Sequence, residues 1–88
     1  MNFDITFSDR FRKHFKSLSE TEKKQFRNKL SVFAESQMHP SMRTKRIQGS
    51  PYLWEFSVNM DIRVLWYYEN STTIVLQDIG HHDILKNL

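Results

Sequence analysis

Residues 62–68 read Ile-Arg-Val-Leu-Trp-Tyr-Tyr, a run rich in β-branched and aromatic side chains that predicts a β-strand. Successive side chains of a strand point to opposite faces of a sheet, so Arg63 shares its face with Leu65 and Tyr67. Burying an unpaired guanidinium would cost too much free energy, which indicates that this face is open to solvent near Arg63. The run thus predicts a sheet with one covered face and one open face.

Three further strands are expected around this one, over residues 45–48, 52–58 and 72–79. The three breaks between the four strands are each three residues long and are rich in Gly, Pro, Asn and Ser, as short hairpins require. The four strands therefore form an antiparallel meander. Alternation points Trp54, Phe56 and Val58 toward the covering layer, and Glu55 and Ser57 toward the open face.

The N-terminal half predicts one more strand and two helices. Apolar and polar residues alternate over residues 3–7, and Ser8 is placed to cap a helix. Residues 19–22, Ser-Glu-Thr-Glu, have the spacing of a capping box and begin a second helix. The apolar stripes are Phe11, Phe15 and Leu18 in the first helix and Phe26, Leu30 and Phe33 in the second. Residues 36–44 lose this periodicity and contain Pro40, so a loop is expected there.

This order of elements, β-α-α-β-β-β-β, predicts the α+β class. Eighty-eight residues are enough for one domain, and we expect residues 1–88 to form it. Its two-helix hairpin should pack on one face of a curved, mainly antiparallel sheet. The longest apolar run, Val64 to Tyr68, is too short to cross a bilayer, and the absence of cysteine fits a reducing cytoplasm. We therefore expect a cytoplasmic protein with no membrane segment.

The net charge of +3 is unevenly distributed along the chain. Residues 1–46 hold eleven Lys or Arg and five acidic residues, whereas residues 47–88 hold two and five. Lysines and arginines of the helices are interpreted as a solvated surface, but Arg43, Lys45 and Arg46 leave a loop and enter a strand. Such a basic cluster favours an anionic partner, either a polyphosphate or an acidic protein segment.

The last predicted strand is followed by Gly80-His81-His82-Asp83. An imidazole exchanges protons near neutral pH, and a guanidinium stays charged at any working pH. Together with Arg63, these histidines would suit a phosphodiester substrate. A metal site is not expected, because adjacent residues rarely direct all their donors at one ion and the other histidines, His14 and His39, lie on different elements.

The order of elements, with Lys45-Arg46-Ile47-Gln48-Gly49, Leu53-Trp54-Glu55-Phe56, Arg63-Val64-Leu65-Trp66-Tyr67 and Ile79-Gly80-His81-His82, resembles the RelE/ParE toxin superfamily. The resemblance covers essentially the whole chain. It implies a RelE-like fold and a small bacterial toxin. Most such toxins cut messenger RNA in the ribosomal decoding site without a metal or other cofactor, whereas the ParE branch poisons DNA gyrase.

The resemblance implies a role for three residues in catalysis. Arg63 matches the strand arginine that contacts the scissile phosphate; an ion pair with Asp61 or Glu55 is the structural alternative. His82 matches the histidine that transfers protons in the YafQ-like branch; the alternative is an ordinary surface histidine. Lys45 lies where relatives have a carboxylate or a histidine, and would stabilise the pentavalent phosphate rather than act as a base.

Four residues are expected to bind RNA. Arg43, Arg46 and Lys86 would hold the backbone, and His81 would carry a second proton or stack on a base. Lys86 lies roughly where many of the family's nucleases have a terminal aromatic residue, and this chain has no aromatic there.

The resulting hypothesis is the toxin of a type II toxin–antitoxin system, a ribosome-dependent endoribonuclease neutralised by an acidic antitoxin. Such a toxin would contact DNA only indirectly, through the antitoxin. A gyrase poison and a catalytically weak protein that mainly binds its antitoxin are the alternatives.

Overall fold

The computed structural model describes the backbone of residues 3–87 and the side chains of residues 3–84. Its helices and strands follow the predicted order, so the α+β class is confirmed. Their bounds are β1 Asp4–Phe7, α1 Asp9–Phe15, α2 Glu20–Glu35, β2 Lys45–Arg46, β3 Trp54–Ser57, β4 Ile62–Tyr68 and β5 Thr73–His81. Two 3-10 helices that the sequence did not predict are η1, Pro40–Met42, within the expected loop, and η2, His82–Asn87, after β5.

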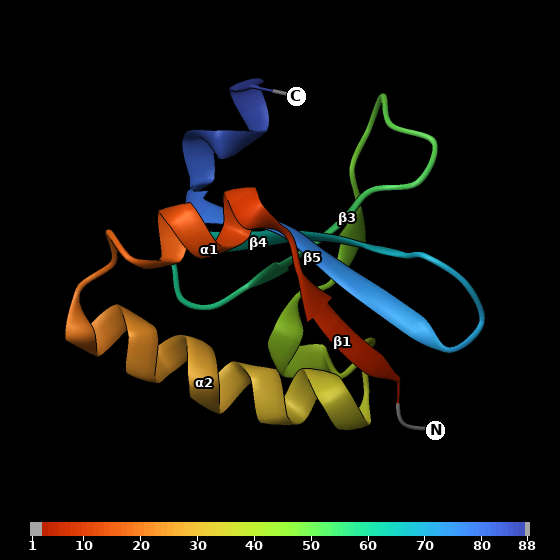
Figure 1. Ribbon diagram of the computed structural model, residues 1–88, viewed down its shortest axis with the longest axis horizontal. Helices are drawn as coiled ribbons and strands as arrows, with labels where there is room; N and C mark the ends of the chain where they lie inside the picture. Colours follow the sequence, from red (N-terminus) through yellow and green to blue (C-terminus); the bar gives the residue numbers. More distant parts are fainter. Residues whose placement is uncertain (1–2, 88) are drawn as a thin grey trace.

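The strands form one sheet in the order β1-β5-β4-β3-β2. β1 runs parallel to β5, and every other neighbouring pair is antiparallel, as the mainly antiparallel prediction required. Figure 1 shows β1 (red) beside β5 (blue), although these strands come from opposite ends of the sequence. The sheet therefore pairs a strand from near the start of the sequence with one from near its end.

Both predicted helix starts are confirmed by their caps. The Ser8 hydroxyl accepts a hydrogen bond from the Phe11 amide at 3.0 Å. Ser19 and Glu22 form a complete capping box, in which each side chain accepts a hydrogen bond from the other residue's amide. α1 ends at Phe15, before Leu18, because the Ser17 and Leu18 amides bond to carbonyls three residues back and close a turn. Leu18 is nevertheless buried in the core.

The centre of the meander is confirmed, since β4 occupies the predicted residues 62–68. β2 and β3 are shorter than expected because the chain folds tightly between them: Gly49 has a φ of 89°, and the Ser50 hydroxyl accepts from the Leu53 amide at 3.2 Å. β5 is longer than expected and reaches His81, which pairs with Ile62. A bulge between Leu65 and Trp66 interrupts the β4–β5 register without ending it.

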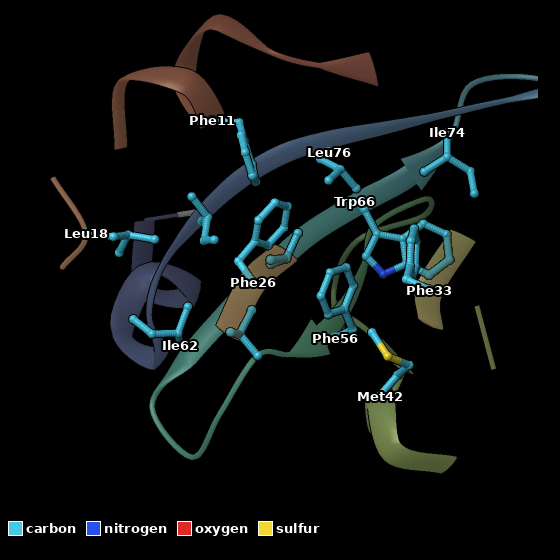
Figure 2. Close-up of a cluster of buried hydrophobic side chains, with 13 residues drawn as sticks. Phe11, Leu18, Phe26, Phe33, Met42, Phe56, Ile62, Trp66, Ile74 and Leu76 are labelled. Atoms are coloured by element: carbon cyan, nitrogen blue, oxygen red, sulfur yellow. The ribbon is translucent and has the colours of Figure 1, made fainter. Parts of the chain in front are cut away.

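The main hydrophobic core lies between the sheet and the helices. Phe26 and Phe33 of α2 meet Phe56 and Trp66 of the sheet, and the ring centroids of Phe33 and Phe56 are 4.7 Å apart (Figure 2). Phe56, Val58 and the partly buried Trp54 belong to this cluster, which confirms the predicted faces of β3. Fully burying one such aromatic side chain is worth roughly 1.5–3 kcal/mol, so this layer supplies most of the apolar stabilisation.

A smaller cluster lies on the opposite face of the sheet. Ile47, Leu53 and Leu65 form it, and Tyr67 and Ile84 pack against it. This confirms that Leu65 and Tyr67 lie on the face away from the main core. Ile84 belongs to η2, so the C-terminal 3-10 helix covers part of a face that the sequence predicted to be open. A Cβ atom added to Gly80 would lie 2.5 Å from Ile84 Cγ2, so this close approach depends on a glycine.

Candidate functional site

Arg63 lies in β4, on the same face as Leu65, with its side chain partly exposed. Its Nη1 donates to the carbonyl of Asn59 at 2.8 Å and to that of Ile62 at 3.3 Å. Within the described side chains, Arg63 makes no ion pair, so neither Asp61 nor Glu55 is its partner. Backbone carbonyls of the β3–β4 turn thus hold one nitrogen of the guanidinium, while its positive charge is not neutralised by a carboxylate among these residues.

Lys45 and Glu55 face each other across β2 and β3. The Lys45 ammonium is 3.2 Å from Glu55 Oε1, and the lysine side chain is 70% exposed whereas that of the glutamate is 3% exposed. The other carboxylate oxygen, Oε2, is buried and has no hydrogen-bond partner among the described residues. A buried carboxylate oxygen without a hydrogen-bond partner costs free energy, so Glu55 depends on the contact with Lys45.

A hollow of about 590 Å³ opens beside this pair. Lys45 and Glu55 line it together with residues of the turn that follows β2, including Gly49 and Ser50. We call it the Lys45 hollow. Because it contains both signs of charge and part of the smaller apolar cluster, it is suited to a polar ligand with an anionic group.

Asp61 connects the histidine that ends β5, His81, to the histidine that begins η2, His82. Its Oδ2 is hydrogen-bonded to His81 Nδ1, and its Oδ1 lies 3.4 Å from His82 Nδ1. The pairing of Ile62 with His81 creates this cluster, because it brings the start of β4 to the end of β5. All three side chains are more than half exposed, so the cluster is open to a ligand.

The hydrogen bonds of this cluster set its protonation. The bond to Asp61 raises the pKa of the His81 imidazole above its usual value of 6.5. The bonds from His81 and then His82 lower the pKa of the Asp61 carboxyl below its usual value. Each of these two groups therefore favours the charged form of the other, and the protonated His81 can donate a proton.

The sheet register brings the candidate residues into two adjacent rows on the face opposite the main core. Ser57, Arg63 and Gly80 occupy one row, and Glu55, Leu65 and Asp78 occupy the next. Diagonal neighbours on a sheet are about 7–8 Å apart, so the positions of Glu55 and Arg63 are within reach of one small ligand. The histidine cluster lies at the end of the same two strands, β4 and β5, one and two residues beyond Gly80.

Of the remaining basic residues that the sequence selected, Arg46 adjoins the Lys45 hollow and Arg43 does not. Arg43 has a left-handed backbone (φ 51°) and lines a separate hollow with Lys29 and Met60. Arg46 lines the Lys45 hollow next to Lys45. It pairs with Trp54, and its guanidinium stacks 5.0 Å from that ring, on the side of the main core. The backbone of Lys86 lies in η2, and its side chain is outside the described residues.

His14, the histidine of α1, contacts the buried carboxylate of Asp78 and does not belong to a metal site in the described part of the chain. Its Nδ1 lies 2.6 Å from Asp78 Oδ1, and Arg10 Nε lies 3.1 Å from Oδ2 of the same carboxylate. These contacts fasten α1 to β5. No group of three potential metal ligands occurs in the described part of the chain, and no helix there is long and apolar enough to cross a membrane.

For two residues of the site, Asp61 and Glu55, the sequence predicted no role beyond a possible ion pair with Arg63, although it placed Glu55 on the open face. The register of the hairpins determines which side chains these two carboxylates contact. Lys45 opposite Glu55, and Ile62 opposite His81, follow once the turn positions are known, but the shortening of β2 and β3 could not be read from the pattern of residue types.

No family model and no curated protein matches the sequence of this chain. Its structure, in contrast, is similar to several solved toxins. A chain of the Escherichia coli DinJ-YafQ toxin-antitoxin complex has a TM-score of 0.78 at 14% identity, with 97% of this chain and 98% of that chain covered. A chain of the archaeal RelE-RelB complex from Pyrococcus horikoshii OT3 has a TM-score of 0.72 at 13% identity, with 92% and 96% covered.

The E. coli toxin RelE, solved as a mutant in the free state, has a TM-score of 0.75 at 16% identity, with 99% of this chain and 93% of that chain covered. At these identities the likeness establishes the fold. The chain therefore has the fold of the RelE and YafQ toxins, as the resemblance of its sequence motifs implied.

Proposed function

We propose that this chain, whose fold is that of the RelE and YafQ toxins, is the toxin of a type II toxin–antitoxin pair and cuts messenger RNA bound to the ribosome. A fold alone does not define an activity. The observation that carries the proposal is the combination, at one end of β4 and β5, of Arg63 with two solvent-exposed imidazoles held by Asp61.

The reaction that suits these groups is transfer of a phosphodiester to the neighbouring ribose hydroxyl. The 2′-oxygen forms a bond to phosphorus, the bond from phosphorus to the 5′-oxygen breaks, and the products carry a 2′,3′-cyclic phosphate and a 5′-hydroxyl. His82 accepts the proton of the 2′-hydroxyl. His81, whose pKa is raised by Asp61, delivers a proton to the departing 5′-oxygen.

Charge develops on the non-bridging phosphate oxygens during this step. Arg63 is suited to stabilise it, because a guanidinium offers several donors in a fixed plane and only Nη1 is engaged by the backbone within the described residues. Lys45, on an edge strand and 70% exposed, can add a second positive charge while Glu55 limits its freedom. No step requires a metal ion or another cofactor.

The test is cell-free translation of an end-labelled message with the wild-type chain, Arg63→Ala and His82→Ala. Wild-type protein should produce cuts within the coding region, mapped by primer extension, and each variant should reduce the cleavage rate about 100-fold or more. Lys24→Ala, on the exposed surface of α2, is the matched control and should cut normally. An intact message together with arrested DNA supercoiling would instead indicate a gyrase poison.

The partner proposed is an acidic antitoxin with an amphipathic segment. An apolar groove of about 460 Å³ runs between α1 and α2 over Phe15, Phe26 and Leu30. Arg12, Lys16 and Arg27 line its edges. An apolar floor with a basic rim complements a helix or strand that carries apolar and acidic side chains.

A further inference from the structure

We propose that Tyr52 is a stacking platform for one unpaired base of the RNA, next to the Lys45 hollow. This inference rests on the proposed function and identifies how the site would hold its substrate. A nuclease that acts on single-stranded RNA needs a surface on which an unstacked base can lie, and aromatic side chains supply it.

Tyr52 is an aromatic ring that remains exposed although it lies on an ordered surface. Tyr52, in the turn before β3, is 52% exposed, whereas Trp66 of β4 is 0% exposed. The ring meets Tyr67 edge to face, with centroids 5.3 Å apart and planes at 85°. Tyr67 in turn packs on the smaller apolar cluster, so the platform rests on a fixed support on the face that carries Arg63 and Lys45.

The backbone beside Tyr52 is also held in place. Ser50 Oγ accepts from the amides of Tyr52 and Leu53, at 3.4 and 3.2 Å, and the Arg46 guanidinium donates to the Pro51 carbonyl at 2.8 Å. Gly49 supplies the left-handed backbone that begins this turn. A ring whose backbone and supporting ring are both ordered loses little conformational freedom when a base stacks on it.

A hollow of about 340 Å³ lies against Tyr52, and we call it the Tyr52 hollow. Arg10 and Gln77 line it as well, and their guanidinium and amide groups can bond to the edge of a base. Gly49 and Ser50 line both this hollow and the Lys45 hollow, so the two adjoin. A nucleotide can therefore place its base on Tyr52 while the phosphate of its neighbour approaches Lys45.

The experiment uses ribosomes programmed with a short message, in which each nucleotide near the cut is replaced in turn by an abasic one. Single-turnover cleavage is measured as a function of toxin concentration for wild type, Tyr52→Ala, Tyr52→Phe and the exposed-surface control Met60→Ala. Urea unfolding midpoints establish that each variant is folded.

Tyr52→Ala should raise the half-saturating toxin concentration about tenfold, while Tyr52→Phe and Met60→Ala should match wild type. One abasic position should raise the half-saturating concentration of wild type by the same factor. The same abasic position should not raise the half-saturating concentration of Tyr52→Ala any further. The stacking proposal would be overturned if Tyr52→Ala had the half-saturating concentration of wild type. It would also be overturned if the effect of Tyr52→Ala multiplied with that of every abasic position. Either result would leave the nuclease proposal intact. A wild-type chain that neither binds nor cuts the programmed message would overturn both.

Discussion

Single residues of this site obtain their chemistry from partners on neighbouring strands. Asp61 belongs to the turn before β4, yet its contacts are with the two histidines that end β5 and begin η2. Burying the Glu55 carboxyl group would cost more free energy without the exposed Lys45 opposite it. Protonation and charge at the site are thus properties of the sheet register.

Asp61→Asn should lower the pKa of His81, because the hydrogen bond to the carboxylate is what raises it. The measurement is an NMR titration of the His81 ring protons in both proteins. His39, which is hydrogen-bonded to Ser41 and not to Asp61, provides the internal reference for the spectra. A His81 midpoint that does not move would show that the carboxylate does not set its charge.

The same pair makes stability depend on pH. His81 has a raised pKa when folded, so its contribution is complete below about pH 6.5 and is lost as pH rises through the folded value. Asp61 has a lowered pKa when folded, so its contribution is present above about pH 3.9 and is lost as pH falls through the folded value. The stability advantage of wild type over Asp61→Asn, from urea unfolding, should therefore be greatest between these limits.

Lys45→Met should destabilise the fold at neutral pH by about 1–3 kcal/mol, since it leaves the Glu55 carboxylate buried without its counter-charge, an effect reduced by the exposure of the lysine. The double variant Lys45→Met/Glu55→Gln should recover most of that loss. Free energies of unfolding from urea titration of the four members of the cycle provide the comparison. Additive losses in the double variant would mean that the two side chains act independently.

At the scale of elements, η2 covers part of the face on which the site lies. Gly80→Ala introduces a methyl group into the space that Ile84 occupies, and overpacking of this kind costs about 1–3 kcal/mol. Because Ile84 is at the start of η2, the variant should displace that helix and speed its proteolysis relative to the rest of the chain. Gly80→Ala/Ile84→Ala should restore the unfolding free energy lost to the clash. Persistent loss in the double variant would locate the strain in the backbone.

The sequence predicted the elements well where local chemistry determines them. Ser8 and Ser19 predicted the starts of both helices. The apolar run of residues 62–68 predicted the bounds of β4 and the face on which Leu65 and Tyr67 lie. It failed where tertiary contacts decide: the tight turn at Gly49 shortened β2 and β3, and pairing with Ile62 extended β5 to His81. Of the site, the types of residue were predictable, but Asp61 and Glu55 acquire their partners only through the register.

For the whole molecule, the groove proposed to bind the antitoxin is separate from the candidate site. The interhelical groove and the candidate catalytic residues occupy different parts of the surface, since Arg12, Lys16 and Arg27 line the former and none of them contacts the latter. The triple variant with glutamine at these three positions should bind a co-expressed acidic antitoxin about tenfold or more weakly and cut the message normally. Titration calorimetry and the translation assay measure the two effects, and equal loss in both would mean that groove and site act together.

The parallel pairing of β1 with β5 has a consequence for how the chain folds during its synthesis. β1, residues 4–7, pairs with residues 73–76 of β5, so it has no strand partner until everything between them has been synthesised. Contacts this distant in sequence slow folding. Until that strand is made, a growing polypeptide has its helices and basic loop but an incomplete sheet, and the pairing of Ile62 with His81 that joins Asp61 to the histidines does not yet exist. The candidate site is therefore assembled only after β5 has been made, which is late in the synthesis of the chain.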